Sequence, residues 1–294
     1  MRNFIVILFV LSTNHTVFCQ RDLKTFLELH CPDTIPEVFL KGIVSDKHHE
    51  HSSPTFDFEN NIIYWTTVID STKRHTILQT SYNNGEFTPH TIAPFSGNYK
   101  DFNFILSDRT NFLSSKRPRH DNSEIEVGLW TINKNGNTWE EPSPFYFKKD
   151  SNSYGYRLSS FNSDKNRLYF GTKYSDIIKD EFNYPTEIEN INQILSDKQD
   201  WMFFMSYDES YIIFSSNREG GYGSFDLYIS FKTDENDWTI PLNMGNKINT
   251  KHQERCPGVT DDDKYFFFTR PNPPNRDDIW WVSAKIIDEL KKKK

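Results

Sequence analysis

The segment Asp208-Glu209-Ser210-Tyr211-Ile212-Ile213-Phe214-Ser215 contains the repeating unit of this chain: an acidic turn, then strand-forming residues that end in two apolar residues and a small one. Four other segments share this pattern, and they run from Glu59 to Thr66, Asp108 to Ser114, Asp164 to Gly171 and Asp262 to Thr269. The final small residues of successive units lie 48, 57, 44 and 54 residues apart, close to the ~40–50 residues of a four-stranded propeller blade. The sequence therefore predicts an all-β propeller of about five blades.

Each unit is predicted to form two strands joined by a tight turn, because Asp and Asn bond to their own backbone in turns. A third strand follows, most clearly at residues 225–229 and 278–282, and then a segment with an aromatic residue and a proline, at 87–89, 139–142 and 238–241. Proline lacks the N–H that a central strand donates, so these segments belong at the blade edge. The third unit is the weakest, because its outer strands are hard to find between residues 174 and 201.

The two ends of the repeat region indicate how the ring closes. The last unit stops after its third strand, whereas Ile35-Pro36-Glu37-Val38-Phe39 resembles the outer-strand segment Ile240-Pro241-Leu242. We therefore expect the N-terminal strand to complete the C-terminal blade, which removes two open sheet edges. No long stretch keeps a 3.6-residue apolar period, and only residues 22–30 and 284–290 are predicted to be helical.

Composition excludes several classes of protein. Aromatic residues make up 16% of the 294 residues, which argues against a disordered chain. The 41 acidic residues outnumber the 34 basic ones, giving a formal charge of −7. This balance, with no long basic run, argues against nucleic acid as a partner.

The chain divides into four segments by sequence. Residues 1–19 resemble an export signal, with Arg2 before an apolar run at 4–11 that is too short to span a bilayer. Lipidation at Cys19 and an uncleaved anchor remain alternatives. An N-terminal segment at 20–32, the propeller domain at 33–290 and a basic tail at 291–294 follow. We expect an exported protein, periplasmic or extracellular, with no transmembrane span after cleavage.

Several segments resemble a known family. Residues 213–223 (IFSSNREGGYG) and 226–229 (DLYI), with Trp238, Pro241 and residues 248–250 (INT), are similar to WD40-like propeller repeats of the TolB kind. Residues 278–287 (DIWWVSAKII) and 36–39 (PEVF) resemble exported propeller proteins of Bacteroidetes. The resemblance implies a cell-envelope propeller that acts as a protein-interaction module. Because TolB has six blades and this chain shows five units, the resemblance leaves five or six blades open.

The first strand of most units carries an acidic residue, 7 to 9 residues before the acidic turn: Glu50, Asp101, Asp200 and Glu254, with Tyr156 in the third unit. Since the first strand of a blade lines the central channel, we expect these carboxylates at one channel mouth. Arginines are expected near the same face: Arg117, Arg119, Arg218 and Arg270. They could form a charged rim that binds a ligand or partner. Alternatively, each acid pairs with an arginine or an N–H of a neighbouring blade and fixes the ring.

Histidines and cysteines are the other reactive groups. His48, His49 and His51 form the densest group of metal-ligand residues, and His49 and His51 would share one face of a strand. Exposed histidines are common without metal, so no metal or other cofactor is expected, with His49 and His51 as weak candidates. Cys31 and Cys256 are a candidate disulfide, since the closure of the ring brings Cys31 towards the last blade.

These observations favour a non-catalytic binding or scaffolding module of the cell envelope. Its expected partner is an envelope protein or peptide, with a glycan as another candidate. The sequence contains no Gly-x-Ser-x-Gly elbow, His-Glu-x-x-His pair or phosphate-binding loop. The competing hypothesis is a carbohydrate-active hydrolase or lyase that uses the carboxylates at the channel mouth.

Overall fold

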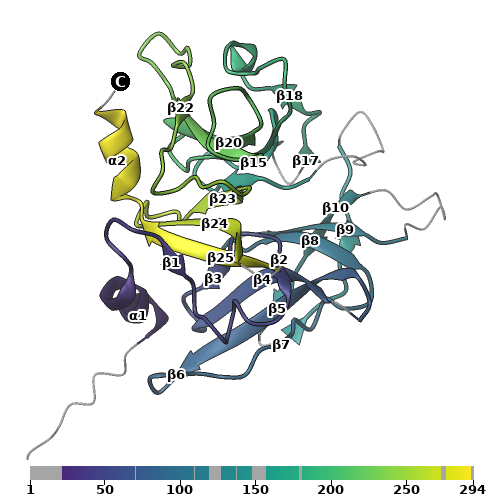
Figure 1. Cartoon of the computed structure of the whole chain (residues 1–294). Coiled ribbons are helices and arrows are strands. Elements are labelled where there is room, and N and C mark those ends of the chain that lie inside the picture. The colour runs from purple at the N-terminus through teal and green to yellow at the C-terminus, as the bar shows by residue number, and fades with distance from the viewer. Residues whose placement is uncertain are drawn as a thin grey trace, which may run out of the picture.

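The computed structural model describes residues 22–69, 71–108, 110–118, 127–136, 138–147, 157–178, 181–272 and 276–292. The expected signal peptide, Arg119 and Tyr156 lie outside these residues. Within the described part the chain forms five antiparallel sheets that follow one another in sequence, each with its strands in the order of a propeller blade. The fold is a five-bladed propeller, as the repeat predicted (Figure 1).

The first three blades follow the predicted order, with short extra strands at their outer ends. Blade 1 contains β2 (His49–Glu50) and β3 (Thr55–Asp57), then β4 (Ile62–Ile69), β5 (Arg74–Asn83), β6 (Glu86–Phe87) and β7 (Thr91–Ile92). Blade 2 contains β8 (Lys100–Ile105), β9 (Asn111–Lys116), β10 (Gly128–Ile132), β11 (Lys134–Asn135), β12 (Thr138–Trp139) and β13 (Ser143–Pro144). Blade 3 contains β14 (Ser160–Asn162), β15 (Arg167–Phe170), β16 (Lys173–Ile178), β17 (Glu181–Phe182) and β18 (Thr186–Glu187), followed by the 3-10 turn η1 (Ile191–Gln193).

The last two blades confirm how the ring closes. Blade 4 contains β19 (Asp200–Met205), β20 (Tyr211–Ser216), β21 (Asp226–Phe231) and β22 (Leu242–Asn243). Blade 5 contains β23 (Arg255–Val259), β24 (Tyr265–Asn272) and β25 (Arg276–Ser283), and its outer strand is β1 (Glu37–Val38) from the other end of the chain. β1 pairs antiparallel with β25, Glu37 opposite Trp281. The predicted closing strand is thus present.

Two predictions about the outer strands need adjustment. The aromatic residues Phe87 and Trp139 lie in short hairpin extensions, and the outermost strand starts only after the proline that follows each of them. Proline therefore separates the extension from the edge strand, because it cannot donate to the preceding ladder. The third blade does have an outer strand, β18, which pairs with β16 over only two residue pairs. It is as short as the outer strands of the other blades, so the weak sequence pattern there does not reflect a missing strand.

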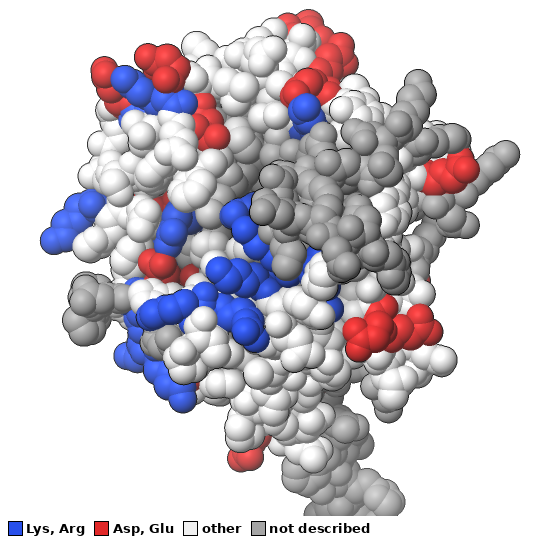
Figure 2. All heavy atoms as spheres, turned by 90° about the vertical axis from the view of Figure 1, so that its right-hand side faces the viewer, with Lys and Arg blue, Asp and Glu red and all other residues white. Residues whose placement is uncertain are grey.

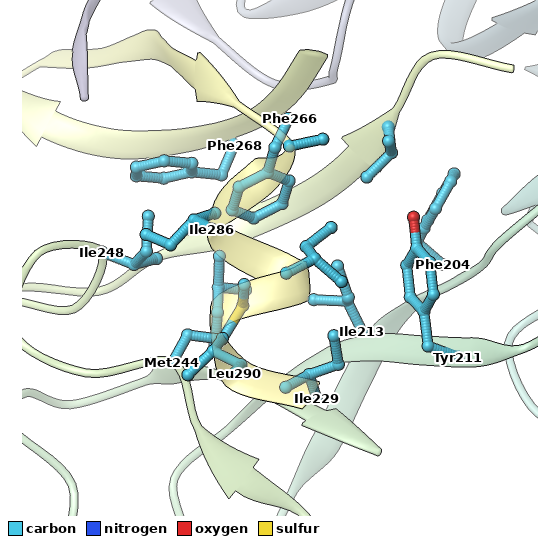
Figure 3. Close-up of a cluster of buried hydrophobic side chains, with 14 of the residues drawn as sticks. Phe204, Tyr211, Ile213, Ile229, Met244, Ile248, Phe266, Phe268, Ile286 and Leu290 are labelled. Atoms are coloured by element: carbon cyan, nitrogen blue, oxygen red, sulfur yellow. The ribbon is translucent and has the colours of Figure 1, made fainter. Parts of the chain in front are cut away.

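The core is divided into five apolar clusters, one at each junction between neighbouring blades. This number supports the count of five blades independently of the strand pairing. The two predicted helices cover this core. α1 (Leu23–His30) buries Leu23 and Leu27 at the junction of blades 5 and 1, and α2 (Lys285–Lys291) lies on the same side of the molecule (Figure 1). Figure 3 shows Ile286 and Leu290 of α2 among residues of blades 4 and 5.

In blades 1, 2, 4 and 5 the first strand carries a local irregularity next to its acidic residue. The pairing register shifts after Asp101 in blade 2, after Trp201 in blade 4 and after Arg255 in blade 5, and β2 and β3 are separate strands in blade 1. Met202 and Cys256 adopt positive φ at these shifts. Such bulges bend a strand and change the direction of the next side chain, so the acid and the residues after it face different surroundings.

Candidate functional site

The four first-strand acids occupy equivalent positions in their blades. Glu50 lies opposite Thr67, Asp101 opposite Ser115 and Asp200 opposite Ser216 on the second strand. Glu254 directly precedes Arg255, which lies opposite Thr269. The alignment of these acids in the sequence is therefore confirmed in the backbone register.

Blade 2 shows what this position does. Asp101 is fully buried and accepts hydrogen bonds from the Ser96 hydroxyl (2.6 Å), the Ser115 hydroxyl (2.6 Å) and Arg117 Nη2 (3.0 Å). The same Arg117 Nη2 donates to the Phe95 carbonyl oxygen at 2.6 Å. The arginine thus ties the buried carboxylate to the loop that leads into the first strand.

Blade 4 repeats this arrangement. Asp200 accepts from the Ser196 backbone N–H (2.7 Å) and hydroxyl (2.9 Å) and from Arg218 Nη2 (2.9 Å), which also donates to the Ile194 carbonyl oxygen (3.0 Å). Burial alone would raise the pKa of Asp200, but the hydrogen bonds from Ser216, Ser196 and Arg218 bring it below its ordinary value. The ionised carboxylate is therefore the stable form in this blade.

Blade 5 keeps the same components in a looser geometry. Glu254 accepts from the Thr250 hydroxyl (2.8 Å) and N–H (3.1 Å), and Arg270 donates to the Ile248 carbonyl oxygen at 3.4 Å. Burial raises the pKa of Glu254 to about 7, despite the Thr250 bonds and the charge of Arg270. We call the shared arrangement of acid, hydroxyl and arginine in blades 2, 4 and 5 the carboxylate lock; its members are Ser96, Asp101, Arg117; Ser196, Asp200, Arg218; and Thr250, Glu254, Arg270.

Blade 1 departs from the lock. Glu50 is 1% exposed, and neither of its carboxylate oxygens makes a hydrogen bond of ordinary geometry with the residues that the structure describes. Burial, with the nearby charges of Asp46 and Asp278, raises its pKa well above the ordinary value, against the effect of Thr67 and Trp65. The same register position therefore has a different electrostatic environment in this blade.

The central channel is a cavity of about 960 Å³ to which all five first strands contribute. Its wall comes from residues within 51–60, 102–108, 157–163, 202–207 and 256–262. Glu50, Asp101, Asp200 and Glu254, expected at one mouth of the channel, are not among the residues that form this wall. Each lies buried against the loop before its strand, because the bulge that follows directs the next residues, and not the acid, to the channel.

Three basic residues next to the first-strand positions lie around His51 and His75 at the channel wall: Lys100 precedes Asp101, and Arg157 and Arg255 follow Tyr156 and Glu254. Arg157, exposed, stacks over the Phe102 ring with its guanidinium carbon 4.9 Å from the ring centroid. The positive charges of Arg157 and Lys100 help to lower the pKa of His75, and those of Arg157 and Arg255 help to lower the pKa of His51. We call Lys100, Arg157 and Arg255 the basic mouth. Figure 2 shows lysine and arginine side chains gathered across the middle of one face, with acidic side chains towards its rim.

The basic mouth also contains two neutral imidazoles. The rings of His51 and His75 lie 4.5 Å apart in T-shaped contact. Burial, and then the positive groups around them, lower the pKa of His51 to about 3 and that of His75 to about 4. Both rings are therefore uncharged at neutral pH and are available as hydrogen-bonding groups. Arg255 is partly neutralised by its ion pair with Asp277, whereas Arg157 makes no ion pair with any residue that the structure describes.

The weak metal candidates His49 and His51 do not come together. His49 Nδ1 lies 4.0 Å from Asp277 Oδ2, while His51 packs on His75. Instead, Asp46, His48 and His90 each offer a ligand atom, and these atoms all lie within 4.8 Å of one another. Sequence reasoning missed His90, because it follows β6 in a loop that only the folded blade brings near residue 48.

The candidate disulfide is absent: Cys31 and Cys256 are both free. In blade 5 the strand order from edge to channel is β1, β25, β24, β23. Cys31 precedes the edge strand, whereas Cys256 lies on the innermost one, with its Sγ 3.5 Å from Met202 Sδ. Two strands, β25 and β24, therefore lie between the two cysteines within this blade.

Arg157 and Arg255 are the main candidate residues that sequence reasoning missed. Each directly follows the first-strand position of its unit, after Tyr156 and Glu254 respectively. The repeat aligned the first-strand positions, and inspecting the residue after each of them would have identified these two arginines.

Comparison with known proteins supports the fold alone. No protein-family model matches the chain, and a search of curated proteins found no match. Among solved structures, the endo-arabinase from Bacteroides thetaiotaomicron VPI-5482 is similar over 82% of this chain and 95% of its own, with 9% identity and a TM-score of 0.51. A TolB-type structure from Agrobacterium tumefaciens is similar over 79% and 76%, with 11% identity and a TM-score of 0.45. A propeller supports many unrelated activities, so this likeness does not identify one.

No helix in the described part of the chain has the length and apolar character needed to cross a membrane.

Proposed function

We propose that this protein is a non-catalytic binding module, exported to the cell envelope, which binds an acidic segment of a partner protein at the basic mouth of its channel. The observation that carries this proposal is Arg157: an exposed guanidinium at the channel wall, held over Phe102 and free of an ion pair with the described residues. A guanidinium presented in this way is suited to bidentate recognition of a carboxylate.

The four first-strand acids are not arranged as a glycosidase pair. A glycosidase needs two carboxylates on either side of one sugar bond, roughly 5 to 10 Å apart, with one kept protonated. Asp101 and Asp200 are each bound to an arginine, and all four first-strand acids are absent from the channel wall. The carbohydrate-active alternative therefore loses the residues on which it was based.

Export is proposed from the sequence of residues 1–19, with its apolar run at 4–11. A location in the envelope would agree with an interaction module of the TolB kind. The test is detection of the processed chain in a periplasmic or medium fraction after expression in a bacterial host, beside a variant in which Ile7 is replaced by Asp. Retention of the unprocessed chain in the cytoplasm would contradict the proposal.

The binding proposal is tested by calorimetric titration of the purified protein with three probes: a hexaglutamate peptide, its hexaglutamine counterpart and neutral arabino-oligosaccharide. We expect binding of hexaglutamate alone, weakening as salt rises because the interaction is electrostatic. Arg157→Gln combined with Lys100→Gln should weaken it at least tenfold. Lys291→Gln, at the exposed end of α2, is the matched control.

Equal binding of the glutamine peptide would contradict recognition of acidic groups. Cleavage of the arabino-oligosaccharide would replace the proposal by the carbohydrate-active alternative. Binding of oligogalacturonate in preference to hexaglutamate would keep the anion site but assign it to an acidic glycan, which overturns the choice of a protein partner.

A further inference from the structure

Blade 1 lacks two of the three components of the carboxylate lock. The hydroxyl residue that lies four positions before the acid in blades 4 and 5, Ser196 and Thr250, is replaced by Asp46, four positions before Glu50. In blades 2 and 4 an arginine, Arg117 or Arg218, comes two residues after the residue that pairs with the acid. In blade 1 the residue at this place is Ile69. Blade 1 therefore has a second carboxylate in place of the hydroxyl and an apolar side chain in place of the arginine.

Two histidines from different parts of the blade meet at this point. Asp46, His48 and His90 each present one ligand atom, all within 4.8 Å of one another. His90 Nδ1 lies 3.9 Å from Asp46 Oδ2 and 3.1 Å from the Ile43 carbonyl oxygen, and the His90 ring meets the edge of Trp65. Packing and a backbone contact thus hold the His90 ring, as they do for imidazoles that bind metals.

Glu50 provides a second and independent indication of a cation. It is 1% exposed and its carboxylate makes no hydrogen bond of ordinary geometry within the described residues. It lies two residues after His48 and, by its equivalence to Asp200 and Ser196, beside Asp46. A buried carboxylate without a partner is costly, and blades 2, 4 and 5 place an arginine near their acid.

We propose that Asp46, His48 and His90 bind a divalent transition-metal ion, and that the donor set of two imidazoles and one carboxylate fits Zn²⁺. Three protein ligands with an open fourth position are typical of zinc, whereas calcium and magnesium prefer oxygen ligands alone. Zn–N bonds of about 2.0–2.1 Å need ligand atoms closer together than 4.8 Å, which small side-chain rotations provide.

This ion would connect the closing segment to blade 1. Asp46 and His48 follow Ser45, whose hydroxyl accepts a hydrogen bond from the Ile279 N–H of blade 5 at 3.1 Å. His90 belongs to the outer part of blade 1, between β6 and β7. The metal would therefore join the N-terminal closing segment to the outer loop of the first blade.

The test is metal binding by the full purified protein after removal of metals with EDTA and dialysis. Calorimetry with Zn²⁺ should give one site, and Co²⁺ should give the visible absorption bands of a four- or five-coordinate ion. His90→Ala and Asp46→Asn should each weaken zinc binding at least tenfold and abolish the zinc-dependent rise in Tm. His49→Ala, a histidine of the same segment outside the cluster, is the matched control and should bind as the parent protein does.

Absence of zinc heat and of cobalt bands in the parent protein would overturn the proposal. It would also be overturned if His90→Ala, with an unchanged circular dichroism spectrum, bound zinc as tightly as the parent protein, or if His49→Ala lost binding instead. His90 lies in a loop, so its replacement leaves the strand ladders intact and keeps the comparison interpretable.

Discussion

In blade 4 the first-strand acid Asp200 is held by Ser196 and Arg218, whereas in blade 1 Glu50 occupies the same register position beside Asp46, with Ile69 in place of the arginine. The two acids share one backbone register, opposite Thr67 and Ser216 respectively, so their different surroundings come from the neighbouring side chains. Blade 1 is also the blade that meets the closing segment. The first-strand acid thus keeps its position in blade 1 but loses the hydroxyl and the arginine that hold it in blade 4, next to the segment where the ring closes.

The largest effect is expected where the lock is most deeply buried. Arg117→Ala in blade 2 leaves Asp101, which is 0% exposed, without its cation. Removing one partner of a buried ion pair costs about 3–5 kcal/mol, so we expect a loss of that size in the free energy of unfolding by urea. The double variant Asp101→Asn/Arg117→Ala should recover part of it. A loss below about 1 kcal/mol would mean that the lock contributes no more than a surface pair.

Blade 5 is expected to respond to pH in the opposite direction to blade 4. The pKa of Glu254 is raised to about 7 from 4.5, so the folded state retains a proton that the unfolded chain releases. The free energy of unfolding should therefore fall as pH rises from 4.5 to 7, by up to about 3 kcal/mol from this group.

Glu254→Gln should remove this part of the pH profile. Asp200→Asn is the matched comparison: because the pKa of Asp200 is lowered, its stabilisation is present above its ordinary pKa and disappears as the medium becomes more acidic. Urea unfolding of both variants across pH 2 to 8 measures the two slopes, that of Asp200 below about pH 4 and that of Glu254 between 4.5 and 7. Parallel profiles for Glu254→Gln and the parent protein would contradict the assignment.

The smallest effect separates blades 1 and 4 most directly. In the metal-free protein at neutral pH, Asp200→Asn should lower the free energy of unfolding by about 1–3 kcal/mol, since it weakens bonds to Arg218 and Ser196. Glu50→Gln should leave the free energy of unfolding unchanged or raise it, because the replaced carboxylate accepts no hydrogen bond of ordinary geometry from the residues that the structure describes. Equal losses in the two variants would show that Glu50 has a partner equivalent to the lock.

The sequence contained enough information for the backbone but not for the side-chain environment. The acidic turns, the strand pattern and the closing segment before Phe39 follow from local pairing rules, and the structure confirms them. The orientation of the acids could not be read from the repeat, because the bulge after Asp101, Trp201 or Arg255 is a shift of pairing between strands. Likewise, the meeting of His48 with His90 depends on a loop that follows five intervening strands, β2 to β6.

The closing strand also bears on the order of folding. Ser45 and Ile279, which are bonded across the closure, are 234 residues apart in the chain. Such contacts form only after a very large loop has closed, which costs chain entropy and slows folding. Blade 5 cannot be completed from its own residues, so a chain emerging from synthesis keeps β1 without its pairing partner until the last strand is available. The joint of the ring is therefore expected to be the last part to form and the first to open.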